Sequence, residues 1–154
     1  MGLDFDFSKL NAMDILDIAI YVEREAAANY EELATWCTKN APDSAAFFVR
    51  MAGWEKLHGD QLSRRRLALF GDTPPNYSDA GAWEVETPDY NKVGPSVSLP
   101  DALQLALEAE KQAEIYYSEA IEFITDDETV FILENLRDAE VEHQRLLEVE
   151  MAKQ

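Results

Sequence analysis

The sequence has little cysteine and few basic residues, and each shortage excludes a class of protein. Its single cysteine, Cys37, has no partner for an internal disulfide and rules out a cysteine-ligated iron centre. We expect Cys37 to be a buried, small apolar residue in a reducing cytoplasm. Lysine and arginine number 13 against 31 acidic residues, so the net charge is -18. Such a charge repels phosphate and anionic lipid, and we expect neither a nucleic-acid nor a membrane partner.

Long apolar runs are also missing. No stretch approaches the roughly 20 apolar residues that a membrane-spanning helix needs. The first ten residues lack a basic segment followed by an apolar one, so no signal peptide is expected, in keeping with a cytoplasmic protein. Hydrophobic residues still make up 47% of the 154 positions. This composition is typical of one folded domain spanning residues 1–154.

Helical periodicity accounts for most of the chain. It predicts four helices at about 11–39, 43–70, 99–124 and 127–152, with a connector at 71–98 that holds four of the six prolines. Asn11 and Ser98 are placed to cap helices, and Gly71 to end one. Short, long and short connections favour an all-α four-helix bundle built from two helical hairpins joined by one crossover. This is the ferritin-like topology.

The two hairpins read as copies of one another. An offset of 87 residues superposes the first predicted helix on the third, and an offset of 85 superposes the second on the fourth. The matched pairs are Glu23 with Glu110, Tyr30 with Tyr117, Glu55 with Glu140, and His58 with His143. A two-fold arrangement of the hairpins would bring these pairs together at the centre of the bundle.

The repeated residues have the chemistry of a metal site. Glu23 and Glu110 lie on the apolar stripes of their helices, where a charged carboxylate is costly unless a cation pairs with it. Glu55 and His58 are three residues apart and leave the same face of a helix, as do Glu140 and His143. Four carboxylates and two imidazoles supply six ligands for two divalent metals, whose charge they balance.

Chance is the alternative explanation. Glutamate fills 18 of the 154 positions, so both histidines would have one at i−3 in about one chain in seventy. The independent Glu23/Glu110 repeat argues against it. Tyr30 and Tyr117 are either core aromatics or hydrogen-bond donors to the ligand carboxylates. Glu114 follows Glu110 by one turn and is expected to border the site.

These motifs resemble the di-iron carboxylate proteins of the ferritin-like class, and most of all the rubrerythrin family. The resemblance covers nearly the whole chain and rests on the two Glu-x-x-His motifs and on Glu-x-x-Ala-x-x-x-Tyr in both odd-numbered helices. It implies two irons, with Glu55 and Glu140 bridging them, although the same ligands accept manganese or zinc. It also implies a homodimer. The rubredoxin-like segment of full-length members has no counterpart here, so an external rubredoxin-type electron donor is expected.

The resemblance implies an oxidoreductase that reduces hydrogen peroxide, or dioxygen more slowly. Peroxidases of the family carry a further glutamate three residues after the third-helix ligand, where this chain has Ala113. A ferroxidase or iron-storage protein is therefore the alternative. A third possibility is a bundle whose metals serve folding alone.

Overall fold

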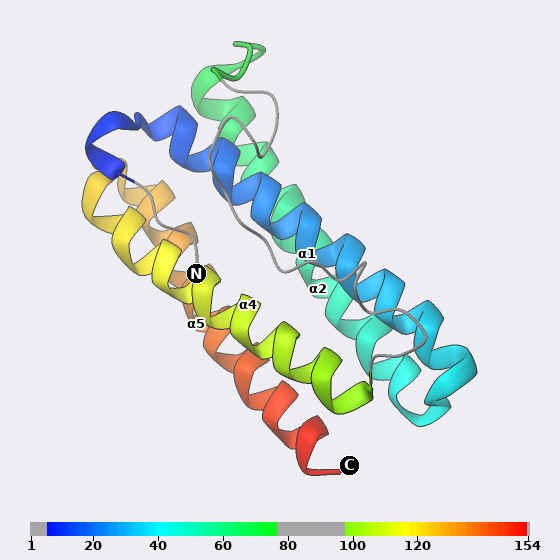
Figure 1. The fold of residues 1–154 in the computed structure, drawn as a ribbon. Helices are drawn as coiled ribbons and strands as arrows, with labels where there is room; N and C mark the ends of the chain where they lie inside the picture. The colour runs from blue at the N-terminus through cyan, green and yellow to red at the C-terminus, as the bar shows by residue number, and fades with distance from the viewer. Residues whose placement is uncertain (1–5, 77–97, 154) are drawn as a thin grey trace.

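The computed structural model describes residues 6–76 and 98–153, which form four long helices and two short 3-10 turns (Figure 1). The helices are α1 (Ala12–Asn40), α2 (Pro42–Phe70), α4 (Leu99–Ala120) and α5 (Asp127–Ala152), and the turns are η1 (Phe7–Lys9) and η3 (Ile121–Phe123). Helices α1 and α2 form one antiparallel hairpin, and α4 and α5 form the other. Helix α4 begins at the end of the bundle opposite to where α2 stops. The predicted all-α bundle of ferritin-like topology is confirmed.

The ends of the helices follow local side-chain chemistry. Asn11 and Asp14 form a reciprocal cap at the start of α1, in which each side chain accepts a hydrogen bond from the other's backbone N–H. At the starts of α4 and α5, the side chains of Ser98 and Asp126 accept hydrogen bonds from the backbone N–H groups of Asp101 and Thr129. Gly71 follows α2 at φ 58°, a left-handed value that favours glycine.

The predicted end of the third helix, at residue 124, is wrong. Helix α4 ends at Ala120, and the chain tightens into the 3-10 turn η3 before Ile124 becomes extended. Extension places Ile124 in the core, where it is 7% exposed. Helical periodicity cannot register this change because a 3-10 turn keeps nearly the same apolar spacing. Most of the predicted connector, at 77–97, lies outside the described residues.

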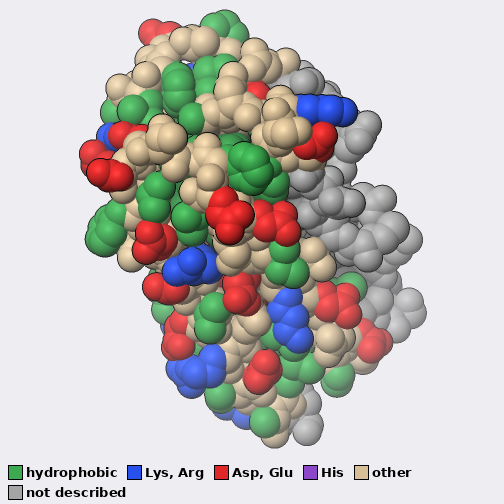
Figure 2. Space-filling view, turned by 90° about the vertical axis from the view of Figure 1, so that its left-hand side faces the viewer, with side chains coloured by type: hydrophobic (Ala, Val, Ile, Leu, Met, Phe, Trp, Pro, Cys, Tyr) green, Lys and Arg blue, Asp and Glu red, His purple; other side chains and the backbone are tan. Residues whose placement is uncertain are grey.

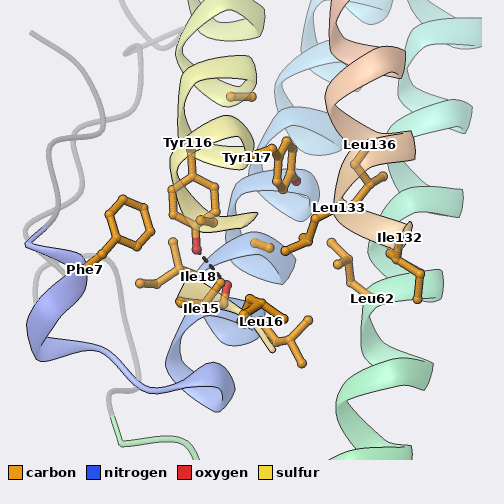
Figure 3. Packing of buried hydrophobic residues seen from close by; sticks show 14 residues of the cluster. Phe7, Ile15, Leu16, Ile18, Leu62, Tyr116, Tyr117, Ile132, Leu133 and Leu136 are labelled. Carbon is orange, nitrogen blue, oxygen red and sulfur yellow. Dashed lines mark hydrogen bonds between the residues drawn. The ribbon is translucent and has the colours of Figure 1, made fainter. Parts of the chain in front are cut away.

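The apolar core is divided into two clusters, one toward each end of the bundle. The first cluster joins the start of α1 and α5 to the ends of α2 and α4, and includes Leu133, Leu136 and Tyr116 (Figure 3). In it the Tyr116 hydroxyl donates to the backbone carbonyl of Ile15 at 2.7 Å. The second cluster occupies the opposite ends of the same helices and includes Cys37, which is fully buried as expected. The middle of the bundle is left to polar side chains.

Two arginines near the end of α2 tie that helix to its neighbours. Arg66 donates to the Asp17 carboxylate of α1 at 2.8 Å. Arg65 donates to Asp126 Oδ2 at 2.6 Å and so bonds the residue that caps α5. Because Arg65 is largely buried and bonds a helix cap, it links the two hairpins at one end of the bundle.

The surface is acidic without being uniformly so. On the face shown in Figure 2, acidic side chains are scattered among apolar and basic ones, and no histidine is visible. Several large apolar side chains are exposed, Phe131 among them at 64%. None of the described helices combines the length and apolar character needed to cross a bilayer.

Truncating Leu133 tests the packing of the first cluster. Leu133 is fully buried, and Leu133→Ala should lower the free energy of unfolding by about 2–5 kcal/mol because it leaves a cavity. Urea denaturation followed by circular dichroism measures the change. Phe131→Ala, two residues away on the solvent face, is the matched control and should cost less than about 1 kcal/mol. Equal losses in the two variants would contradict this packing.

Candidate metal centre

The repeated glutamates and histidines meet at the middle of the bundle, between the two apolar clusters. Each of the four helices contributes: Glu23 from α1, Glu55 and His58 from α2, Glu110 from α4, and Glu140 and His143 from α5. The four glutamates are between 1% and 3% exposed. Mid-helix glutamate is therefore buried on every helix, as the apolar stripes predict for Glu23 and Glu110.

The six side chains divide into two overlapping groups. Glu23, Glu55, His58 and Glu140 form one group, and Glu55, Glu110, Glu140 and His143 form the other. Within each group the ligand atoms all lie within 4.8 Å of one another, a spread that one metal ion can span. Glu55 and Glu140 belong to both groups. This is the position that a carboxylate must occupy to bridge two ions.

Missing hydrogen bonds identify the same six residues. In the described part of the chain, seven buried side-chain nitrogen or oxygen atoms have no hydrogen-bond partner. Six of them belong to this centre, one for each residue: Glu23 Oε2, Glu55 Oε1, His58 Nδ1, Glu110 Oε2, Glu140 Oε1 and His143 Nδ1; the seventh is Trp36 Nε1. Buried polar atoms are rarely left unpaired. Converging unpaired acceptors fit a pair of cations.

Two tyrosines hold the outer glutamates across the hairpin boundary. The Tyr30 hydroxyl donates to Glu110 Oε1, and the Tyr117 hydroxyl donates to Glu23 Oε1, both at 2.6 Å. The two bonds are equivalent under the sequence repeat, because each tyrosine donates to the glutamate of the other hairpin. In both glutamates the hydrogen bond engages Oε1 and leaves Oε2 for the centre. Both interpretations of the tyrosines therefore hold, since each ring packs in an apolar cluster and each hydroxyl bonds a glutamate.

The imidazole of His143 sits close to two carboxylates. Its Nδ1 lies 2.8 Å from Glu55 Oε1 and 3.5 Å from Glu110 Oε2. Neither contact has the alignment of a hydrogen bond, because Nδ1 and both oxygens are without a partner. His58 Nδ1 lies 3.7 Å from Glu23 Oε2. These nitrogens and oxygens thus lie close together without bonding one another.

The central carboxylates resist ionisation without a cation. Burial, strengthened by the charges of Glu23 and Glu110, raises the pKa of Glu55 well above its ordinary value. Burial and the charges of Glu110, Glu55 and Glu23 likewise raise the pKa of Glu140. Burial also acts on Glu23, but its contacts with Glu55, His58 and Tyr117 outweigh it and lower the pKa to about 2. The metal-free centre therefore keeps protons on the two shared carboxylates.

Two further residues lie close to the residues of the centre, Glu114 as a candidate from the sequence and Trp54 as one that the sequence analysis missed. Glu114 belongs to neither group; its Oε1 accepts a hydrogen bond from Gln144 Nε2 at 2.8 Å, along the seam of α4 and α5. Trp54 was not singled out by the sequence, yet its ring stacks on His143. Trp54 immediately precedes Glu55, and an aromatic residue beside a Glu-x-x-His motif is the signal that could have found it.

Solved structures of other proteins share the fold of this chain. A conserved protein from Magnetospirillum magnetotacticum shares 27% identity and superposes with a TM-score of 0.76 over 94% of this chain and 95% of its own. A hypothetical protein from Pyrococcus furiosus shares 21% identity, with a TM-score of 0.79 over 96% and 92%. A candidate ferritin-like diiron-carboxylate protein from Thermotoga maritima shares 22%, with a TM-score of 0.72 over 94% and 96%. All three share the fold of this chain, the ferritin-like four-helix bundle.

The family follows from the sequence itself. The rubrerythrin family model matches residues 14–151, which include every residue of the centre. The chain belongs to the rubrerythrin family. No curated protein matches the sequence. The family implies a di-metal site. The buried cluster of carboxylates and histidines in this chain agrees with that implication.

The raised pKa values predict how the metal-free protein responds to pH. Below the ordinary glutamate pKa of 4.5, Glu55 and Glu140 are protonated whether the chain is folded or unfolded. As the pH rises above 4.5 the unfolded chain releases these protons, whereas the folded chain keeps each one until the pH reaches the raised pKa of that carboxyl. Stability should then fall by about 1.4 kcal/mol per pH unit for each retained proton. Glu23 acts oppositely, since its contribution is present above pH 4.5 and is lost as the pH falls toward about 2.

Urea denaturation of the metal-free protein between pH 5 and 8 measures this slope. The double variant Glu55→Gln/Glu140→Gln cannot lose the protons, so its stability should fall less steeply. Glu108→Gln/Glu119→Gln removes the same charge from exposed positions of α4 and is the control. If stability fell with pH as steeply in the buried double variant as in this control, Glu55 and Glu140 would not be the source of the pH dependence.

Proposed function

We propose that the centre binds two irons and that the protein is a non-haem di-iron oxidoreductase of the rubrerythrin type. It would reduce hydrogen peroxide, or dioxygen more slowly, with electrons from an external protein donor. The observation that carries this proposal is the convergence of six unpartnered buried ligand atoms from four helices. Glu55 and Glu140, shared by both groups, are the proposed bridges, and Glu23, His58, Glu110 and His143 the proposed terminal ligands.

The donor set fits two divalent cations. Four carboxylates neutralise two dications, and the carboxylate and imidazole ligands suit iron, manganese and zinc alike. Two irons would supply the two electrons that, with two protons, convert hydrogen peroxide to water. The same centre without redox turnover would serve folding alone.

The protein's own residues prepare the site for this chemistry. Tyr30 and Tyr117 orient Glu110 and Glu23 through their hydroxyl groups, so that one oxygen of each carboxylate stays directed inward. The apolar clusters on either side exclude water along the bundle axis. Glu55 and Glu140 give up protons when cations arrive, which couples metal binding to pH.

A ferroxidase or iron-storage role is the second candidate, and Ala113 is the residue that favours it. Ala113 lies on α4 three residues after Glu110 and is 5% exposed, packed in the first apolar cluster. It stands where family peroxidases carry a further glutamate. A rubredoxin-type donor and a homodimer are part of the peroxidase proposal, whereas iron storage requires a shell-like assembly.

Removing either shared carboxylate should empty the centre. Glu55→Ala and Glu140→Ala each take a ligand from both metal positions, so bound metal should fall from two per chain to well below one. Metal analysis after Fe(II) loading and desalting measures it. Glu142→Ala, at an exposed position two residues after Glu140, should keep both metals. Undiminished metal in both buried variants would refute the proposed centre.

Oxidation kinetics should separate the two candidate functions. Protein loaded anaerobically with Fe(II) is mixed rapidly with hydrogen peroxide or, separately, with dioxygen, and the ferric absorbance is followed. A peroxidase is expected to oxidise faster with peroxide and to retain its iron afterward. Faster oxidation by dioxygen, release of iron, and a shell-sized particle in light scattering would favour the ferroxidase and storage function. If bound metal supported folding but reacted with neither hydrogen peroxide nor dioxygen, the role of the metal would be structural only.

A further inference from the structure

One of the two histidines in the centre is covered by a tryptophan. The indole of Trp54, on α2, stacks on the imidazole of His143, on α5, with ring centroids 5.5 Å apart and planes inclined by 22°. Trp54 is itself 37% exposed, so it lies between His143 and the solvent. The side chain of His143 is left only 5% exposed.

The other histidine, His58, stacks on His143 but has no tryptophan at the matching position. The 85-residue offset that matches His58 with His143 matches Trp54 with Ala139. The exchanged tyrosine bonds show that the hairpins are related by an approximate two-fold. That relation puts a methyl group beside His58, where the other half of the centre has an indole. The side chain of His58 is accordingly 18% exposed.

The seam between α1 and α2 differs from its counterpart, although Arg24 bonds Ser63 and Lys56 pairs with Glu31 across it. Between α4 and α5, Gln144 bonds Glu114 across the seam; the equivalent residues between α1 and α2 are Gly59 and Ala27. A pocket of about 380 Å³ opens along that seam, lined by Arg24, Ala27, Ala28, Glu31, Lys56 and Asp60. Gly59 lies against the centre, since a Cβ on it would be 3.8 Å from the Cβ of Glu23. Arg24 Cγ lies nearer still to that Cβ position, at 3.5 Å, and Glu23 is only 1% exposed, so the thinner cover is over His58 alone.

We propose that the two metal positions are inequivalent in access. The position held by Glu23, Glu55, His58 and Glu140 is the open one, where metal ions exchange and small oxidants arrive first. Trp54 seals the position held with His143 and keeps that imidazole in place. A chelator, an oxidant or water must reach the ligand shell to act on the metal, so the thinner cover decides which position reacts. This inference rests on the proposed di-metal function.

The difference in cover is measurable without metal. Diethyl pyrocarbonate modifies accessible imidazoles, and the chain has only two histidines, so peptide mass spectrometry assigns every modified site. In metal-free wild-type protein His58 should react several-fold faster than His143. Trp54→Ala should raise the reactivity of His143 toward that of His58, while Trp54→Phe, which keeps a ring over the imidazole, should largely restore protection.

The reciprocal variant places an indole at the position that matches Trp54 in the other hairpin. Ala139→Trp should slow the modification of His58 and leave His143 unaffected. Val141→Trp is the matched control, because it adds an indole two residues away on the same helix at a position that is 48% exposed. It should protect neither histidine. Equal reactivity of the two histidines in wild-type protein, or protection of His58 by Val141→Trp, would overturn the inference.

Metal release extends the test to the loaded protein. Zn(II)-loaded protein mixed with a chromophoric chelator should release its metal in two phases of equal amplitude. Ala139→Trp should slow the fast phase, and Trp54→Ala should speed the slow one. A single phase with two bound metals would overturn this inference and leave the proposed function intact. If the protein bound no metal while the two histidines still differed in reactivity toward diethyl pyrocarbonate, the result would instead overturn the proposed function. The metal exchange that rests on that function would be overturned with it.

Discussion

The structure depends on keeping four carboxylates and two imidazoles in the dry middle of a four-helix bundle. Uncompensated, such a cluster opposes folding, because each carboxylate loses its hydration and repels the others. The two apolar clusters on either side supply the burial that holds the helices together around it. The raised pKa values of Glu55 and Glu140 reflect the same cost. Two divalent cations would convert this repulsion into attraction, which is why a metal centre accounts for the whole arrangement.

The duplicated hairpin supplies two nearly equivalent halves, and the bonds between halves make them one site. Tyr30 reaches Glu110 and Tyr117 reaches Glu23, so neither hairpin completes its own ligand set. Arg65 adds a link between α2 and the cap of α5 at one end. Sequence differences between the copies then matter most beside the centre. An indole in one copy and a methyl group in the other distinguish two metal positions that the repeat alone makes identical.

Much of the fold and of the candidate site is predictable because both follow from local rules. Asn11 and Ser98 cap helices through bonds to residues three positions on, and such bonds require no distant partner. The burial of Glu23 and Glu110 follows from the apolar residues three and four positions away. The end of α4 was misjudged, since the 3-10 turn there depends on Ile124 packing into a cluster made largely by other helices. Stacking of Trp54 on His143 joins residues 89 positions apart and has no periodic signal.

By itself the sequence determined that the chain is an all-α duplicated bundle with an inward-facing carboxylate and histidine set. Those properties depend on spacing along a helix, and spacing is written in the order of the residues. Only the tertiary structure decided that Glu55 and Glu140 lie in both ligand groups, and that Oε1 of Glu23 is taken by Tyr117. It also decided that Trp54 stacks on His143 and that His143 is more deeply buried than His58. Each of these depends on how side chains from different helices approach one another, and that approach is set by packing around the centre.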